Sequence, residues 1–174
     1  MCFCSRFFLT VTILSALCFK VKARSTAHAY AEAGFYKEIG EYKSYLSNIS
    51  GGVVYIRKGF ELGGELHIYK FWNNDYSSIG IGIRPVARYS LVRLGKGISF
   101  LTEVKGGVIY MAPEHPANAV NYTFNAGFAI EMPVTNKNKM RIGFHYSHFS
   151  NGQRSGDIQN PTWDGFGLYV NWLF

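Results

Sequence analysis

From about residue 24 onward the chain alternates apolar and polar residues, with groups of turn-forming residues between the alternating segments. A period of two predicts β-strands, because side chains two positions apart share one face of a strand. Helical periodicity is almost absent. The pattern predicts strands at 29–37, 50–61, 64–72, 76–92, 97–111, 119–133, 139–150 and 164–174.

The connections between these segments alternate in length. Tight turns are expected at Gly63-Gly64, 94–96 and 135–138, and longer loops at 38–49, 112–118 and 151–161. Only Asn73–Asp75 breaks the alternation. Short turns at one end and longer loops at the other are typical of outer-membrane barrels.

The two faces of the predicted strands differ sharply. One face is continuously apolar, as at Phe124, Phe128 and Ile130 in the sixth segment. The other mixes small residues with charges of both signs: Arg57, Glu61, Glu65, His67, Arg84, Arg88, Glu103, Lys105, Glu131, Arg141 and His145. A soluble barrel or sandwich would instead need a polar outside. The pattern therefore favours apolar groups facing lipid and charges paired in a narrow lumen.

Aromatic residues support the membrane interpretation. They make up 17% of the chain, and several lie at strand ends, where interfacial girdles form: Tyr110, Tyr122, Trp172 and Phe174. Most segments are long enough to cross a bilayer at a tilt. The sequence thus predicts an all-β fold, an eight-stranded antiparallel transmembrane β-barrel, in a bacterial outer membrane that the strands cross in multiple passes.

Residues 1–23 resemble a signal peptide rather than part of the barrel. Arg6 precedes an apolar run over 7–19, and Ala23 offers a small residue for cleavage, although the cut could fall as late as residue 29. The barrel domain is then 24–174. All three cysteines lie in the removed segment, which excludes disulfides, thiolate catalysis and Cys-ligated metal from the mature chain.

Charge excludes one further class of function. The formal charge is +7, and removal of Arg6, Lys20 and Lys22 leaves +4, an excess that suits an anionic surface such as lipopolysaccharide. The basic residues form no run or stripe, so nucleic acid is not expected as a partner.

Residues 145–150 contain two His-x-Ser pairs, His145/Ser147 and His148/Ser150. Residues i and i+2 stand side by side on a strand, so each imidazole can reach its hydroxyl. A serine hydroxyl becomes a competent nucleophile when an imidazole accepts its proton, and a third group, usually a carboxylate, orients the ring.

Parity separates the two pairs. His145 and Ser147 share the face of Arg141 and are expected in the lumen, whereas His148 and Ser150 share the lipid-facing parity of Phe144. Asp164 has the lipid-facing parity of the last strand, which should pair with the strand before it. These outward residues would meet at one rim, although each taken singly suits a solvated rim residue.

The motif His148-Phe149-Ser150-Asn151-Gly152, followed by Asn160-Pro161 and an acid before a closing strand, resembles the PagL-type lipid A 3-O-deacylases. The resemblance is specific over 139–174, the expected active-site strands. It implies Ser150 as nucleophile, His148 as general base and Asp164 as the orienting acid. Candidate oxyanion donors are Asn151, Gly152 and Asn160. The family acid is typically Glu, and Asp157 is a second candidate should Asp164 not reach the ring.

The resemblance implies lipid A of lipopolysaccharide as substrate, within outer-membrane lipid, and a mechanism that needs no cofactor and no metal. An acyl groove is expected from Phe144, Tyr146, Phe149, Trp163 and Phe166, and Arg154 is a candidate ligand of lipid A phosphates. The oligomeric state stays open, with a homodimer as one option. Two alternatives also stay open: a non-enzymatic small barrel, such as an adhesin, resistance factor or structural protein, and another lipid acyl hydrolase or acyltransferase.

Overall fold

The structure is a computed structural model that describes residues 26–40, 43–113, 119–151 and 162–174. These residues form a closed antiparallel barrel, in which each strand pairs with the next and β1 pairs with β8. The predicted fold class is confirmed. The strands are β1 (Thr26–Glu38), β2 (Tyr45–Arg57), β3 (Phe60–Trp72), β4 (Ser77–Leu94), β5 (Ile98–Ala112), β6 (Val120–Pro133), β7 (Lys139–Ser150) and β8 (Trp163–Leu173).

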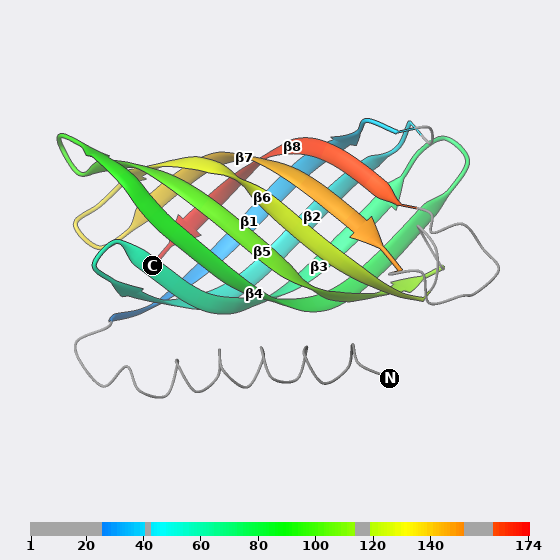
Figure 1. Ribbon diagram of the computed structural model, residues 1–174, viewed down its shortest axis with the longest axis horizontal. Coiled ribbons are helices and arrows are strands. Elements are labelled where there is room, and N and C mark those ends of the chain that lie inside the picture. Colours follow the sequence, from blue (N-terminus) through cyan, green and yellow to red (C-terminus); the bar gives the residue numbers. More distant parts are fainter. Residues whose placement is uncertain (1–25, 41–42, 114–118, 152–161) are drawn as a thin grey trace, which may run out of the picture.

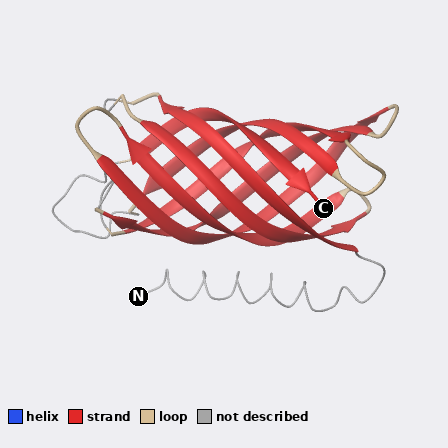
Figure 2. Cartoon of the chain, turned by 180° about the vertical axis from the view of Figure 1, so that it is seen from behind, coloured by secondary structure: helices blue, strands red, loops and turns tan. Residues whose placement is uncertain are grey.

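The two ends of the barrel differ (Figure 1). The β2–β3, β4–β5 and β6–β7 connections, Thr26 and Phe174 lie at one end, which we call the turn end. The strand ends that the other four connections join lie at the opposite end, the loop end. Every described element is a strand (Figure 2). Among the described residues there is no helix with the length and hydropathy needed to cross a membrane.

Side chains alternate between a buried interior and an exposed apolar surface. Ile68, Leu168 and Val170 are examples of the exposed set. The middle of the interior holds a charged network, in which Lys105 Nζ lies 2.6 Å from Glu32 Oε1. Further pairs include Arg84–Glu65, Arg88–Glu103, Arg141–Glu61 and Arg141–Glu131. A charge buried without a counter-ion would be strongly destabilising, so the pairing permits a polar lumen.

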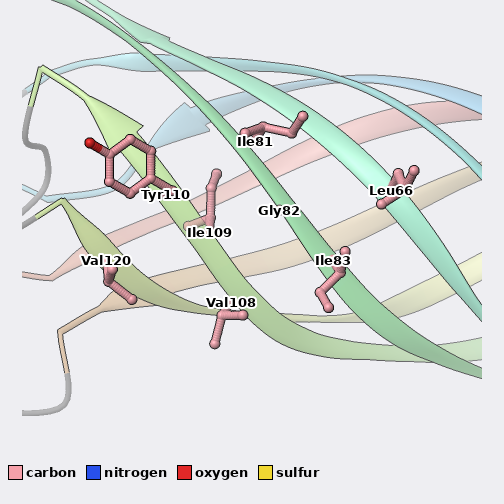
Figure 3. A pocket seen from close by; sticks show the side chains of 8 residues that line it. All are labelled: Leu66, Ile81, Gly82, Ile83, Val108, Ile109, Tyr110 and Val120. Carbon is pink, nitrogen blue, oxygen red and sulfur yellow. The ribbon is translucent and has the colours of Figure 1, made fainter.

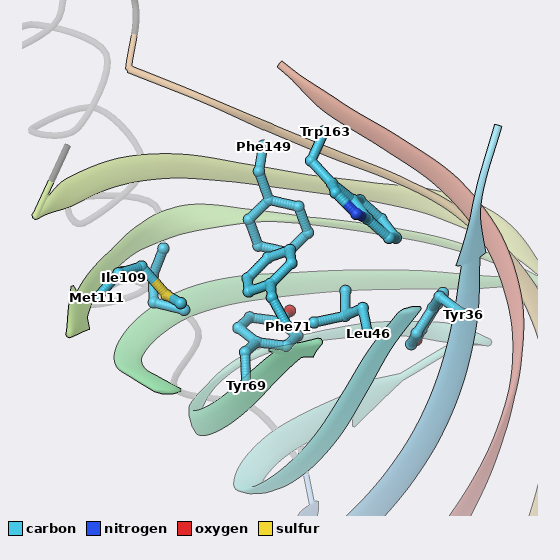
Figure 4. Packing of buried hydrophobic residues seen from close by; sticks show 8 residues of the cluster. All are labelled: Tyr36, Leu46, Tyr69, Phe71, Ile109, Met111, Phe149 and Trp163. Atoms are coloured by element: carbon cyan, nitrogen blue, oxygen red, sulfur yellow. The ribbon is translucent and has the colours of Figure 1, made fainter. Parts of the chain in front are cut away.

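The loop end of the interior is filled instead by apolar and aromatic side chains. We call this cluster the aromatic plug (Figure 4); it consists of Tyr36, Leu46, Tyr69, Phe71, Ile109, Met111, Phe149 and Trp163. Phe71, Phe149, Trp163 and Tyr69 make edge-to-face contacts within it, with centroids 4.9 Å apart for Phe71 and Phe149. Such contacts are favourable for aromatic pairs and hold the rings in fixed orientations.

The turn predicted at Gly63-Gly64 is wrong. The β2–β3 turn lies at Lys58-Gly59, whose φ values of 50° and 83° suit a two-residue hairpin. Gly63 lies within β3, where a Cβ would be only 2.0 Å from the carbonyl oxygen of Val53. This glycine permits two strands to approach closely and does not form a turn.

Two further predictions about β2 are also wrong. The strand begins at Tyr45 and not at residue 50, because Asn48 and Ser50 face the polar lumen and are compatible with a strand. Arg57 was assigned to the lumen, but it is exposed and lies opposite Phe60 on the outer face. Because the turn does not lie at Gly63-Gly64, the face of the strand that the sequence analysis assigned to Arg57 is the wrong one.

Candidate active site

The candidate site lies at the loop end, where β7 finishes and β8 begins. The alternation of buried and less buried residues places His145, Ser147 and Phe149 inside the barrel and His148 on its outer face. In β8 the same alternation places Trp163 inside and Asp164 outside. His148 and Asp164 are direct partners in the β7–β8 register, so the two strands bring an imidazole and a carboxylate together.

The contact between these two residues is short and specific. His148 Nδ1 lies 2.8 Å from Asp164 Oδ1, and the two side chains are 33% and 29% exposed. An ionised carboxylate only accepts hydrogen bonds, so Nδ1 carries the proton and Nε2 presents its lone pair. This is the tautomer that a histidine needs in order to take a proton from a serine hydroxyl. Asp164 reaches the ring, and no substitute from the following loop is required.

A second residue holds the carboxylate. The hydroxyl of Tyr146 donates a hydrogen bond to the same Asp164 Oδ1 that contacts His148. The backbone is fixed as well, since the amide of Ile39 donates to the Asp164 carbonyl at 2.9 Å. Sequence analysis placed Tyr146 only in an acyl groove. The available signal was its parity, because it lies two residues before His148 on the same face.

Ser150 is the last residue of β7 and lies opposite Tyr122 of β6. It follows His148 by two positions along the strand, and its exposure is only 9%. Asn151 comes next and is buried, with 2% exposure. The remaining predicted site residues, Gly152 and Asn160, lie outside the described residues, as do Arg154 and Asp157.

The aromatic plug lies behind the site. Phe149, between His148 and Ser150, points inward and packs edge to face against Trp163, with ring centroids 5.7 Å apart. The indole Nε1–H of Trp163 donates to Ser44 Oγ at 2.7 Å. Phe149 and Trp163 are both 0% exposed, so the prediction that they line a lipid-side groove is wrong. Their inward parity makes them anchors for the two strands that carry the site.

The other His-x-Ser pair lies in the lumen. His145 is fully buried and stacks on Tyr169, with ring centroids 4.1 Å apart. Its Nε2 lies 2.5 Å from Glu103 Oε1, and its Nδ1 lies 3.3 Å from the Tyr36 hydroxyl. Ser147 accepts a hydrogen bond from the Asn125 amide. These contacts integrate the inner pair into the charged network of the barrel.

An apolar groove of about 380 Å³ lies on the outer surface over β3 to β6, and β6 is the strand next to β7 (Figure 3). Its lining residues come from β3 to β6: Leu66, Ile81, Gly82, Ile83, Val108, Ile109, Tyr110 and Val120. One row of paired residues joins it to the site, running from Ser150 through Tyr122, Val108 and Ile83 to Leu66.

This row descends along the barrel as it leaves the site. Ser150 ends β7 at the loop end, whereas Leu66 is midway along β3. Four strand spacings around the closed barrel separate them, so Leu66 lies on the side of the barrel opposite Ser150. The groove therefore runs around the outer surface, away from Ser150 and lower on the barrel.

Comparison with known families decides what kind of barrel this is. The family model described as "Lipid A 3-O-deacylase (PagL)" matches residues 50–172, which is more than half of the chain and includes β3 to β7. The chain belongs to the PagL family. No curated protein sequence matches it.

Solved structures agree on the fold. The outer membrane enzyme PagL superposes with a TM-score of 0.61 and 11% sequence identity, covering 84% of this chain and 98% of that one. Neisserial surface protein A superposes with a TM-score of 0.60 and 12% identity, covering 87% and 99%. The similarity to a surface protein as well as to an enzyme shows that the barrel alone does not decide activity.

The resemblance drawn from the sequence implied Asp164 as the orienting acid in place of a typical Glu, whose side chain is one methylene longer. The 2.8 Å contact with His148 shows that the shorter side chain reaches the ring. Among the described residues, no group of three or more His, Cys, Asp or Glu side chains is arranged to hold a metal ion.

Proposed function

We propose that this protein is an outer-membrane esterase that removes the 3-O-linked acyl chain from lipid A of lipopolysaccharide. The observation that carries the proposal is the hydrogen-bonded His148–Asp164 pair on the outer face of the barrel, two residues from Ser150. In this proposal the barrel resides in the bacterial outer membrane, and its loop end faces the outer leaflet. Residues 1–23, with the cut as late as residue 29, are the proposed signal peptide.

The proposed chemistry proceeds in two halves. Ser150 Oγ attacks the ester carbonyl while His148 Nε2 accepts the hydroxyl proton, and Asp164 stabilises the imidazolium. The tetrahedral oxyanion then collapses, and the sugar 3-oxygen leaves with the proton from His148. Water, deprotonated by His148, next attacks the acyl-serine ester. The products are a free fatty acid and lipid A with a free 3-hydroxyl.

Donors near the end of β7 would stabilise the oxyanion. Asn151 is buried directly after the nucleophile, where a fixed amide donor suits this task. Gly152 and Asn160 are proposed to assist on the strength of the family resemblance.

The apolar groove supports an acyl ester as the reacting group. Its lining residues lie on β3 to β6, of which β6 is the strand next to β7, and they are apolar throughout. An acyl chain that lies along the groove would enter from the leaflet itself, with its ester at the rim.

Mass spectrometry of lipid A tests the proposal. Cells that express the protein should contain lipid A that is lighter by one 3-hydroxyacyl chain, and Ser150→Ala should abolish this change while the barrel still assembles. Ser147→Ala is the matched control, since the same substitution in the lumen should leave deacylation intact. Unchanged lipid A with the wild type would refute the activity. Loss from phospholipids, or a gain in lipid A mass, would instead indicate a phospholipase or an acyltransferase.

A further inference from the structure

The turn end of the barrel carries exposed cations on each of its three connections. Lys58 lies between β2 and β3, Lys96 between β4 and β5, and Lys137 between β6 and β7, and all three are exposed. Arg57, the last residue of β2, is exposed as well and lies on the outer face of the barrel. We call these four residues the turn-end cations.

No exposed acid balances this charge. The two glutamates nearest the turn end, Glu61 and Glu131, are buried and pair with Arg141. Lys139 also pairs with Glu131. Within the described ranges, none of the turn-end cations forms an ion pair, and no Asp or Glu at this end is exposed. Arg93, a further exposed cation of this end, has the inward parity of its partner on β5 and is not counted among the four.

A belt of exposed aromatic rings lies just inside the turn-end cations. Tyr55 precedes Arg57 by two residues in β2, and Phe60 follows Lys58 by two residues. The Phe60 ring lies 6.0 Å from that of Tyr89 in β4, measured between centroids. All three rings are exposed on the outer surface. Because such rings mark the boundary between hydrocarbon and headgroups, the cations next to them lie at the depth of the headgroups.

The three turns are spread around the whole rim. Two strands separate each turn from the next, and the two ends of the barrel domain, Thr26 and Phe174, occupy the remaining quarter (Figure 1). A compact soluble protein that contacts one turn would leave the others uncovered. The lipids that surround the barrel contact all three turns at once, and Arg57 extends toward them from the outer face.

The loop end differs in charge. Its exposed lysines, Lys37, Lys43 and Lys70, are accompanied by the exposed Asp75 and the partly exposed Asp164. The two leaflets of a membrane would therefore meet different surfaces, one of mixed charge at the loop end and one that is uniformly positive at the turn end.

We propose that the turn-end cations bind the headgroups of anionic phospholipids in the leaflet that surrounds the turn end. In the orientation proposed above this is the periplasmic leaflet, but the proposal does not depend on catalysis. Lysine and arginine side chains near a membrane surface attract anionic lipids, and salt weakens the attraction. Contacts on all three turns hold this end of the barrel at a fixed depth.

Quenching of tryptophan fluorescence by brominated lipids tests the proposal. Trp172 lies on the outer face near the turn end, Trp163 is fully buried, and Trp72→Phe removes the outward tryptophan of the loop end. In mixed vesicles, the relative association constant at Trp172 should favour brominated phosphatidylglycerol over brominated phosphatidylcholine about fivefold. Lys137→Gln, in the turn beside β8, should bring this ratio close to one, and so should high salt.

A second reporter tests whether the preference extends around the rim. Tyr55→Trp, combined with Trp72→Phe and Trp172→Phe, places a fluorophore two residues from Arg57. Arg57→Gln/Lys58→Gln should abolish the preference at position 55 and leave that at position 172 unchanged, whereas Lys137→Gln should do the reverse. Quenching by brominated phosphatidylcholine confirms in every variant that the barrel is inserted.

A matched variant removes charge at the other end. Lys37→Gln/Lys43→Gln/Lys70→Gln neutralises three exposed cations of the loop end and should leave both reporters unchanged. An equal loss in this variant would show attraction by the net charge of the whole barrel and overturn the proposal. Equal quenching of the wild type by the two lipids would also overturn it and leave the cations to a soluble acidic partner. The vesicles contain no lipid A, so failure of the deacylase function would not change these results.

Discussion

The two His-x-Ser pairs of β7 share one strand and one spacing, yet they lie in opposite environments. His145 and Ser147 are fully buried in a lumen where every neighbour is part of the barrel. His148 and Asp164 keep about a third of their side-chain surface exposed on the outer face. Under the proposed function, an acyl ester in the membrane would approach the outer face, where His148 and Asp164 lie. The comparison teaches that the face of the strand decides the surroundings of a His-x-Ser pair, as much as its residue types do.

The acids beside the two histidines differ in the same way. Glu103 contacts His145, but it also pairs with Arg88 and Lys105, so its charge belongs to the structural network. Asp164 is held by His148 and Tyr146 on the outer surface. One carboxylate mainly balances charge, whereas the other can orient an imidazole for proton transfer.

Exchanging each histidine for glutamine should give the largest contrast. His148→Gln should lower kcat by about 10⁴-fold or more, because no group remains to accept the serine proton. His145→Gln should keep deacylation within a few-fold of wild type. Release of fatty acid by the purified proteins measures both. Similar losses in the two variants would mean that the outer pair is not the reacting one.

The two carboxylates provide the second contrast. Asp164→Asn should lower kcat roughly 10²- to 10³-fold, because the amide cannot hold the imidazolium. Glu103→Gln should leave kcat nearly unchanged but lower the free energy of unfolding by about 3 kcal/mol, because Arg88 and Lys105 lose a buried counter-ion. Urea unfolding in lipid vesicles gives the second quantity. A catalytic defect in a stable, folded Glu103→Gln barrel would contradict this division.

The third contrast concerns stability behind the site. Phe149→Ala should lower the free energy of unfolding by about 3 kcal/mol, since it opens a cavity in the aromatic plug. Phe144→Ala, five residues earlier on the lipid-facing side, removes the same ring from an exposed position and should cost far less. Tryptophan fluorescence during urea titration compares the two. Equal losses would show that the plug does not support β7.

Tyr146→Phe should produce the smallest effect. Asp164 then keeps His148 but loses one of two donors to the same oxygen, so kcat should fall about fivefold with no loss of stability. Tyr169→Phe removes a hydroxyl from the lumen instead and should leave kcat unchanged. A kcat for Tyr146→Phe equal to that of wild type would show that the hydroxyl does not help to hold the acid.

Much of this architecture is present in the alternation of the sequence. Parity alone placed His148 and Asp164 outside and His145 and Ser147 inside, because a strand has only two faces. Turn chemistry was harder to predict: the consecutive glycines at 63–64 resemble a turn, whereas Lys58 takes the positive φ that the hairpin needs.

Contacts between strands depend on the pairing register of neighbouring strands, which cannot be read from the sequence alone. The bond from Tyr146 to Asp164 joins residues 18 apart in sequence and exists only because β7 and β8 pair as they do. The inward position of Phe149 followed from parity, but its aromatic character suggested an acyl groove. The plug that it joins is assembled from six strands and could not be identified from any one of them.

Closure of the barrel by β8 has a consequence for when the protein becomes active. Asp164 is aligned by β7 on one side and by the amide of Ile39 on the other, so the first and last strands must meet before the acid is fixed. Under the proposed function, a chain whose first and last strands have not yet paired would carry Ser150 and His148 without this alignment, and so would not hydrolyse lipid. Activity that appears before β1–β8 pairing in a time-resolved folding assay would contradict this dependence of activity on barrel closure.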